Sequence, residues 1–177
     1  AEETIRAAAA TLFDNGAEGM YLSSTAAISL DVFKGISSME ALANQSKLYA
    51  WGPGETTVNG SGSTALLPIT LSAGQPRAIT LHAPEARAPK SVFLWLEARE
   101  ELDPDKIYVE LNDQSLELVA SDRLTWPFAS EVKRPFHRAE RVLCFSVSPS
   151  WLQSMNQLLV VADTPVTLDY VYLGIIH

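Results

Sequence analysis

The chain has 177 residues, of which 47% are hydrophobic and 19% charged. This composition argues against a disordered or fibrous protein, because such proteins lack the apolar groups that form a core. Its 13 Lys and Arg residues against 21 Asp and Glu residues give a formal net charge of −8, which disfavours a general nucleic-acid surface. The single cysteine, Cys144, excludes an internal disulfide and a cysteine-cluster zinc site. No apolar run approaches the ~20 residues that cross a bilayer.

The first residue, Ala1, is not a methionine, so we expect a chain that was processed, trimmed from a tag or cut from a longer protein. The alanine run at 7–10 does not fit a secretory signal, because Glu2 and Glu3 occupy the place of a positive region and Asp14 ends the apolar stretch early. Localisation stays open; an extracellular or periplasmic protein fits if a signal peptide has been removed.

The opening residues predict a helix followed by a short strand. Apolar residues recur at helical spacing over 2–14, and two acidic residues at the start suit the positive end of the helix dipole. Asn15-Gly16 supplies a C-cap, because glycine adopts the left-handed conformation without a steric penalty. A strand is expected directly afterwards, at 19–22.

A second helix is predicted from Ser37-Ser38-Met39-Glu40, which fits a capping box with Ser37 as the cap, and we expect this helix to run to about Tyr49. Residues 1–51 would then form a helix-strand-helix segment, which is a piece of an α/β layer and not a complete domain. Residues 52–64 hold four of the nine glycines and have no apolar periodicity, so we place a flexible linker there.

From residue 65 onward the hydrophobic pattern has a period of two. A turn at Asn112-Asp113-Gln114 marks a hairpin, and 148–152 fits a single helical turn with proline at its first position. Short strands without long helices between them predict a mainly β fold, an antiparallel jelly-roll β-sandwich over 65–177 that follows the helix-strand-helix segment. The expected strands are 66–72, 77–83, 91–99, 106–112, 115–120, 141–148, 157–162 and 166–175.

Two patterns resemble known families. Gly16-Ala17-Glu18-Gly19-Met20-Tyr21-Leu22 resembles the entry to the last strand of a bacterial TIM-barrel glycoside hydrolase. A second set of residues is similar to galactose-binding-like jelly rolls, which often form the β-sandwich appended to glycoside hydrolases. The resemblance therefore implies the C-terminal portion of such an enzyme: last barrel strand, last helix, connector and sandwich. The residues that carry the sandwich resemblance are Val109-Glu110-Leu111-Asn112, Phe145-Ser146-Val147, Pro149, Leu152, Asn156, Leu158-Leu159-Val160 and Val166-Thr167-Leu168-Asp169-Tyr170-Val171.

The resemblance has a negative consequence for catalysis. TIM barrels carry their chemistry at the C-terminal ends of the strands. In retaining members of the resembling enzymes the two carboxylates follow earlier strands, which implies that they lie upstream of Ala1 and that this chain holds no catalytic residue. Ser23 and Ser24 would lie at the active-site rim, where they could hydrogen-bond a sugar hydroxyl but not protonate a glycosidic oxygen. The alternative is an ordinary turn from strand to loop.

The longest irregular connection in the sandwich, 121–140, is a candidate carbohydrate site. Trp126, Arg134 and His137 place an aromatic ring beside polar donors, which is what stacking on a sugar ring with directional hydrogen bonds requires. The alternative is that Trp126 and Phe136 anchor a long loop while its arginines face an acidic neighbouring domain. Together with Arg141 the connection has a net charge of +2, from Arg123, Lys133, Arg134, Arg138 and Arg141 against Asp122, Glu131 and Glu140.

Metal sites have weak support in the sequence. Structural calcium needs several converging oxygen ligands, and no spaced motif joins the available aspartates. The three histidines lack the paired spacing of a catalytic zinc site. We therefore expect no cofactor, with structural calcium as the open alternative, and we expect Cys144 and Trp95 to be core residues. The aspartates and histidines are Asp103, Asp105, Asp122 and Asp163, and His82, His137 and His177.

The first functional hypothesis is a non-catalytic C-terminal β-sandwich portion of a glycoside hydrolase-like protein, which supports the catalytic barrel or positions carbohydrate. Its partners would be carbohydrate or an upstream TIM-barrel domain, with no nucleic acid and no membrane span. The alternatives are a free-standing carbohydrate-binding module and an assembly module that docks a protein through the 121–141 loop. Because a barrel strand cannot leave its edges in water, residues 1–50 should pack on the sandwich, pair with another chain or be poorly ordered.

Overall fold

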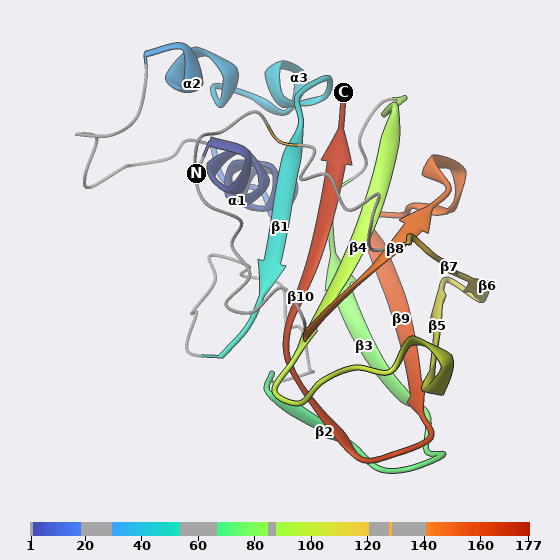
Figure 1. The fold of residues 1–177 in the computed structure, drawn as a ribbon. Helices are drawn as coiled ribbons and strands as arrows, with labels where there is room; N and C mark the ends of the chain where they lie inside the picture. The colour runs from blue at the N-terminus through green and yellow to red at the C-terminus, as the bar shows by residue number, and fades with distance from the viewer. Residues whose placement is uncertain (1, 19–29, 54–66, 85–87, 121–127, 129–140) are drawn as a thin grey trace.

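A computed structural model describes residues 2–18, 30–53, 67–84, 88–120, 128 and 141–177 of the chain. Figure 1 shows two antiparallel sheets stacked face to face, with helices along one side of the stack. The mainly β, antiparallel fold is the predicted one. None of the helices in these residues combines the length and apolar content needed to cross a membrane.

The larger sheet, sheet A, has the strand order β1-β10-β4-β8-β7, and β2 pairs with β10 as well. In β10, residues 171–175 pair with β1 and residues 166–168 pair with β2, so this long strand forms backbone hydrogen bonds with two short strands along the same edge. The members of sheet A are β1 (Lys47–Trp51), β2 (Ile69–Leu71), β4 (Ser91–Ala98), β7 (Glu117–Leu118), β8 (Val142–Val147) and β10 (Val166–Ile176).

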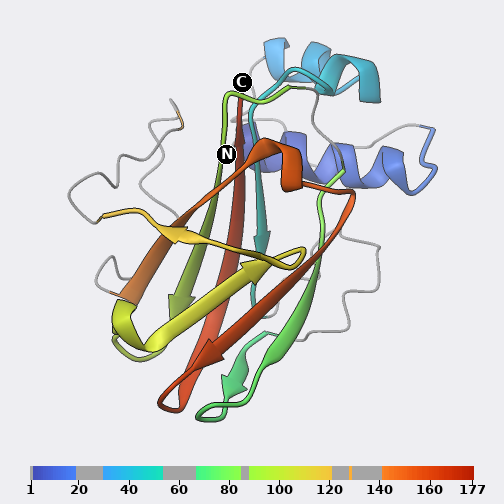
Figure 2. The same cartoon turned by 90° about the vertical axis from the view of Figure 1, so that its right-hand side faces the viewer.

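The smaller sheet, sheet B, has the order β3-β9-β5-β6 and faces the viewer in Figure 2. Asn112 and Asp113 have φ angles of 52° and 61°, so they form the two-residue turn between β5 and β6 that suits the twist of a hairpin. Its strands are β3 (Arg77–His82), β5 (Ile107–Leu111), β6 (Gln114–Ser115) and β9 (Met155–Ala162).

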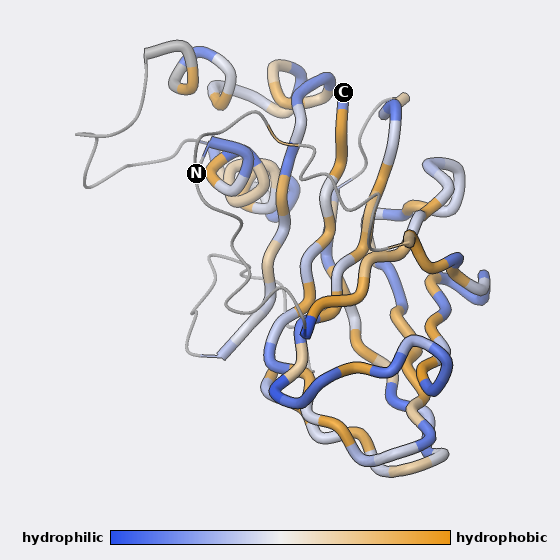
Figure 3. The backbone as a smooth tube through the Cα atoms, viewed as in Figure 1, coloured by the Kyte–Doolittle hydropathy of each residue, from blue (hydrophilic) through white to orange (hydrophobic). Residues whose placement is uncertain are grey.

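Every strand predicted after residue 65 is present, with 115–120 divided into β6 and β7. The hydrophobic residues recur along the strands of both sheets, while the connection around the short helix η1 (Pro104–Lys106) is hydrophilic (Figure 3). Side chains such as Leu94, Leu158 and Leu173 are fully buried between the sheets. The predicted helical turn is η4 (Pro149–Trp151), whose Trp151 packs against this core.

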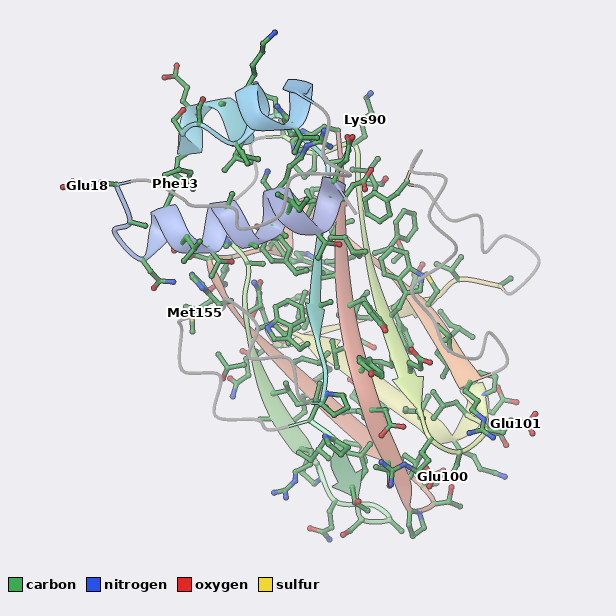
Figure 4. All side chains as sticks on the ribbon, turned by 90° about the vertical axis from the view of Figure 1, so that its left-hand side faces the viewer. Phe13, Glu18, Lys90, Glu100, Glu101 and Met155 are labelled. Carbon is green, nitrogen blue, oxygen red and sulfur yellow. The ribbon has the colours of Figure 1, made fainter. Side chains whose placement is uncertain are left out.

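The first helix, α1 (Glu2–Asp14), has the predicted bounds and the predicted cap. Gly16 has a φ of +87°, and the N–H of Ala17 donates to the carbonyl of Leu12 at 3.0 Å, which is a Schellman motif. The helix lies across the strands on the side of β1 (Figure 4). It reaches sheet B through Asp14, whose Oδ2 lies 2.8 Å from Nε2 of His82. Thus α1 spans the open side of the sandwich between β1 and β3.

The predicted second helix is wrong in its length and its cap. Helix α2 (Leu30–Gly35) precedes it, and α3 covers only Met39–Leu42. Its cap is Ser38 and not Ser37, because the Oγ of Ser38 accepts the N–H of Ala41 at 3.1 Å. Residues 47–51 form β1 instead of the end of a helix. Their backbone groups pair with β10, which a helical conformation would not allow.

The structure ties the beginning of the chain to its end. Of the outcomes expected for residues 1–50, packing on the sandwich is observed for α1 and β1. The strand expected at 19–22 and most of the expected linker, from 54 onward, lie outside the described residues. The division into 1–51, 52–64 and 65–177 stays a prediction.

Candidate functional site

All five residues predicted to contact carbohydrate, Ser23, Ser24, Trp126, Arg134 and His137, lie outside the described residues, so their role stays a prediction. The structure does describe how the 121–140 segment is attached. It leaves the sandwich after β7, returns at Arg141 before β8, and has one described residue between these points, Phe128. The surroundings of Phe128 therefore define the candidate site.

Phe128 is buried against the outer face of sheet A. Its ring centroid lies 6.5 Å from that of Trp95, with the two rings tilted by 49°. A Cβ atom added to Gly174 would lie 2.7 Å from the Trp95 ring and 2.9 Å from the Phe128 ring, so only glycine fits at this point of β10. Phe128 thus anchors the segment, a role that the sequence analysis assigned to Trp126 and Phe136 as its alternative.

Aromatic residues continue along the outer face of sheet A on both sides of this contact. Phe93 and Trp95 of β4 have ring centroids 5.8 Å apart, and Tyr170 and Tyr172 of β10 stack at 5.8 Å with an angle of 15°. These rings and their neighbours form a second hydrophobic cluster, separate from the core between the sheets. We call it the outer aromatic cluster; its buried members are Leu48, Trp95, Phe128, Val142, Cys144 and Tyr172.

Trp95 is buried as predicted, at 1% exposure, but in the outer aromatic cluster and not between the sheets. This follows from alternation in β4, where Leu94 and Leu96 point into the inter-sheet core and Trp95 points away from it. A strand that is buried on both faces is what the apolar run around Trp95 predicted.

The outer aromatic cluster borders a buried carboxylate. Glu97 is 3% exposed, and its Oε2 accepts the hydroxyl of Tyr172 at 3.1 Å. A glycosidic oxygen cannot reach a carboxyl group that is enclosed in this way, so Glu97 has a structural position and not that of a general acid. The contact holds the Tyr172 ring in the cluster.

Cys144 is buried in β8, as predicted. Burial raises the pKa of its thiol from 9.0 to about 12. Since the thiolate is the nucleophile and the metal-binding form, Cys144 stays protonated at neutral pH and behaves as a small core residue.

Two of the residues considered for metal binding, Asp103 and His82, have other partners. Asp103 accepts the N–H of Asp105 at 3.1 Å and pairs with Lys106 at 3.0 Å. His82 contacts Asp14, while Asp122 and His137 lie outside the described residues. In the described ranges, no three side chains of His, Cys, Asp or Glu are placed together so as to hold a metal ion.

A cavity of about 200 Å³ opens at the end of the sandwich where β4 leads to β5 and β9 turns into β10. Glu100 and Glu101 belong to its lining and lie at this end in Figure 4. Glu100 accepts the backbone N–H of Thr167 at 2.7 Å, and Asp103 is held by Lys106. These polar groups bind the ends of neighbouring strands together, which is a structural task.

No protein-family model and no curated protein sequence matches the chain. Among solved structures, wild-type BuGH86 in complex with neoagarooctaose is similar, with 11% identity and a TM-score of 0.41 over 73% of this chain and 19% of that one. A variant of this protein with the same oligosaccharide gives 10% identity and a TM-score of 0.42, covering 73% and 18% of the two chains.

The catalytic unit of a thermostable GH87 α-1,3-glucanase from Streptomyces thermodiastaticus is similar at 16% identity and a TM-score of 0.32, covering 73% of this chain and 24% of that one. The chain thus spans 18–24% of the length of these structures. At such low identities and TM-scores, the function has to be argued from this chain's own residues.

Proposed function

We propose that the chain is the non-catalytic C-terminal β-sandwich portion of a glycoside hydrolase-like protein, in which it supports the catalytic barrel or positions carbohydrate. In this proposal residues 1–51 come from the last β/α unit of a TIM barrel, with 47–51 of this segment joined to sheet A as β1, and 65–177 are a galactose-binding-like jelly roll. The strand order supports the jelly roll. The chain alternates between the sheets from β2 to β5 and from β8 to β10, and β2 lies beside β10, as in two interlocked Greek keys.

The anchoring of Phe128 carries the carbohydrate part of the proposal. Its ring is fixed on Trp95 and Gly174, and Trp126 lies two residues before it in the sequence. When one residue of a connection is fixed on a sheet, ordering its sequence neighbours around a ligand costs less entropy. Trp126 would stack on a sugar ring, while Arg134 and His137 would bond its hydroxyls.

The contacts of two described carboxylates, Glu97 and Asp169, are consistent with a non-catalytic role for the chain alone. Retaining glycosidases need two accessible carboxyl groups about 5 Å apart. Glu97 is enclosed with Tyr172, and Asp169 pairs with Arg99 at 2.9 Å. We therefore infer that the acid and the nucleophile belong to the part of the protein upstream of this chain. An acidic residue at the end of each of two earlier barrel strands is expected in the upstream reading frame.

Affinity electrophoresis against a panel of soluble polysaccharides, combined with a reducing-sugar assay, tests the proposal. We expect binding to at least one polysaccharide without hydrolysis. Trp126→Ala should weaken binding about fivefold or more, while Trp126→Phe, which keeps a ring, should retain most of it. Unchanged melting temperatures control for folding. Indifference to every sugar, together with a salt-sensitive complex with a protein, would instead support the assembly module that docks through 121–141.

A further inference from the structure

Among the described residues, no element lies across the outer face of sheet B, whereas the outer face of sheet A carries Phe128. Figure 2 looks onto this face, and no helix or strand of the described residues crosses in front of it. Strands β3, β9 and β5 pair in continuous register without a bulge, so the face is an even surface. Its outward side chains, alternate to those of the core, are Ala78, Thr80, His82, Tyr108, Glu110, Met155, Gln157, Leu159 and Val161. Of these, His82 is buried beside Asp14 of α1, at one end of the face.

Tyr108 is the aromatic ring of this surface and is 46% exposed. Its hydroxyl donates to Oε1 of Glu110, and Ser115 forms a second hydrogen bond to it. The bond to Glu110 is the main cause that raises the pKa of Tyr108. These contacts fix the ring on the surface before any ligand arrives, which leaves its exposed part available for stacking.

The neighbours of Tyr108 combine apolar and polar groups. Val161 lies directly opposite Tyr108 on β9, and Leu159 lies opposite Glu110, so two half-buried apolar side chains adjoin the ring. Gln157 is exposed one step further along β9. From β5 to β3 the surface extends about 10 Å, twice the spacing of paired strands, which is the length of a short oligosaccharide.

The charge and composition of this surface favour one class of ligand. Its one exposed charged side chain is Glu110, and the outward residues include no lysine or arginine, so the exposed part of the face does not favour an anionic polymer. Thr80, Glu110 and Gln157 stand among its apolar groups, whereas the core of a protein interface is depleted of charged residues. An aromatic ring with a carboxylate beside it, and an amide four residues along the neighbouring strand at roughly 13 Å, fits a neutral oligosaccharide, one sugar of which stacks while the hydroxyls of others bond.

We propose that the outer face of sheet B is a carbohydrate-binding surface for a neutral oligosaccharide, with Tyr108 as the stacking ring and Glu110 and Gln157 as hydrogen-bonding partners. The proposal rests on the proposed function for its class of ligand. It uses no residue of the 121–141 segment and therefore defines a second, independent binding surface.

Isothermal titration of the full chain with cellohexaose, laminarihexaose, xylohexaose and neoagarohexaose tests this surface. Tyr108→Ala should weaken binding of at least one of them about fivefold, and Tyr108→Phe should weaken it less, because it keeps the ring and loses only the hydroxyl contacts that fix it. Gln157→Ala should weaken binding of the same oligosaccharide. The matched control is Leu118→Ala. The side chain of Leu118 is also hydrophobic and 44% exposed, but it lies on sheet A, so this variant should bind like wild type.

Two outcomes separate this proposal from the proposed function. If Trp126→Ala abolishes binding while Tyr108→Ala leaves it unchanged, the surface of sheet B is not a binding site and the loop site stands. If wild-type chain binds none of the four probes, this proposal is overturned, while the polysaccharide panel decides the loop site separately. If Tyr108→Ala changes the oligomeric state of the chain but not its affinity for the oligosaccharides, the outer face of sheet B is an interface between copies of the chain and not a binding site.

Discussion

Lys47, the first residue of β1, is 2% exposed, although lysine is a residue that is almost always at the surface. Its Nζ donates to the carbonyl oxygens of Leu42 at 2.6 Å and Gln45 at 3.0 Å, where α3 ends. Burial, followed by the nearby charge of Arg6, lowers the pKa of Lys47 from 10.5 to about 8. This lysine makes the stability of the protein depend on pH.

Between pH 8 and pH 10.5 the unfolded chain keeps a proton on Lys47 that the folded chain has released. Stability rises with pH wherever the unfolded state binds more protons, by about 1.4 kcal/mol per pH unit for one full proton. Lys47 alone should therefore raise the free energy of unfolding by about 3 kcal/mol across this interval.

Cys144 acts in the opposite direction. Burial raises its pKa from 9.0 to about 12, so above pH 9 the folded chain keeps a proton that the unfolded chain releases. Its contribution to stability is complete below pH 9 and is lost as the pH rises further. We expect the free energy of unfolding of the wild type to rise between pH 8 and pH 9 and then to level off.

Urea unfolding followed by tryptophan fluorescence, from about pH 7 to about pH 10, measures this profile. Lys47→Met should remove the rise, whatever its effect on stability at pH 7, and Cys144→Ala should let the rise continue beyond pH 9. The control is Lys106→Met, because Lys106 is exposed and paired with Asp103, and its loss should leave the rise in place. A rise that persists in Lys47→Met would refute the assignment to the buried ammonium group.

Two further variants test the outer aromatic cluster by urea unfolding at neutral pH. Gly174→Ala should cost about 1–3 kcal/mol, because the new Cβ would lie 2.7 Å from Trp95 and 2.9 Å from Phe128; a neutral effect would mean that the rings are not packed on this strand. Tyr172→Phe should cost about 1 kcal/mol, because it removes one hydrogen bond from the buried Glu97, and unchanged stability would show that this bond contributes nothing.

Most strands of the sandwich could be predicted because their alternation is a local property. In β9, for example, every second residue is buried, and its expected range needed little change. Strand β1 differs, since Leu48, Tyr49 and Trp51 make an apolar run too short to distinguish a helix from a buried strand. Its conformation depends on pairing with Val171 to Ile175 near the other end of the chain, which a local pattern cannot reveal.

The anchor of the 121–140 segment could not be chosen from the sequence either. Trp126, Phe128 and Phe136 are equivalent as aromatic residues in an irregular stretch. The choice is made by Gly174, whose missing side chain leaves room on β10 for the rings of Phe128 and Trp95. A glycine inside an apolar strand signals close approach of another group, and this was the signal that could have identified the anchored face.

The two sheets use their outer faces in opposite ways, and their outward residues are the cause. On sheet A these residues include Trp95 and Tyr172, which are buried with Phe128 in the outer aromatic cluster, whereas on sheet B they include Gln157, Glu110 and Tyr108, which tolerate water. A barrel domain that preceded this chain would connect through α1, which lies on β1 and reaches β3 at the open side of the sandwich. Such a domain could therefore dock along α1 without covering Tyr108, so that support of the barrel and capture of a glycan would be compatible tasks of one sandwich.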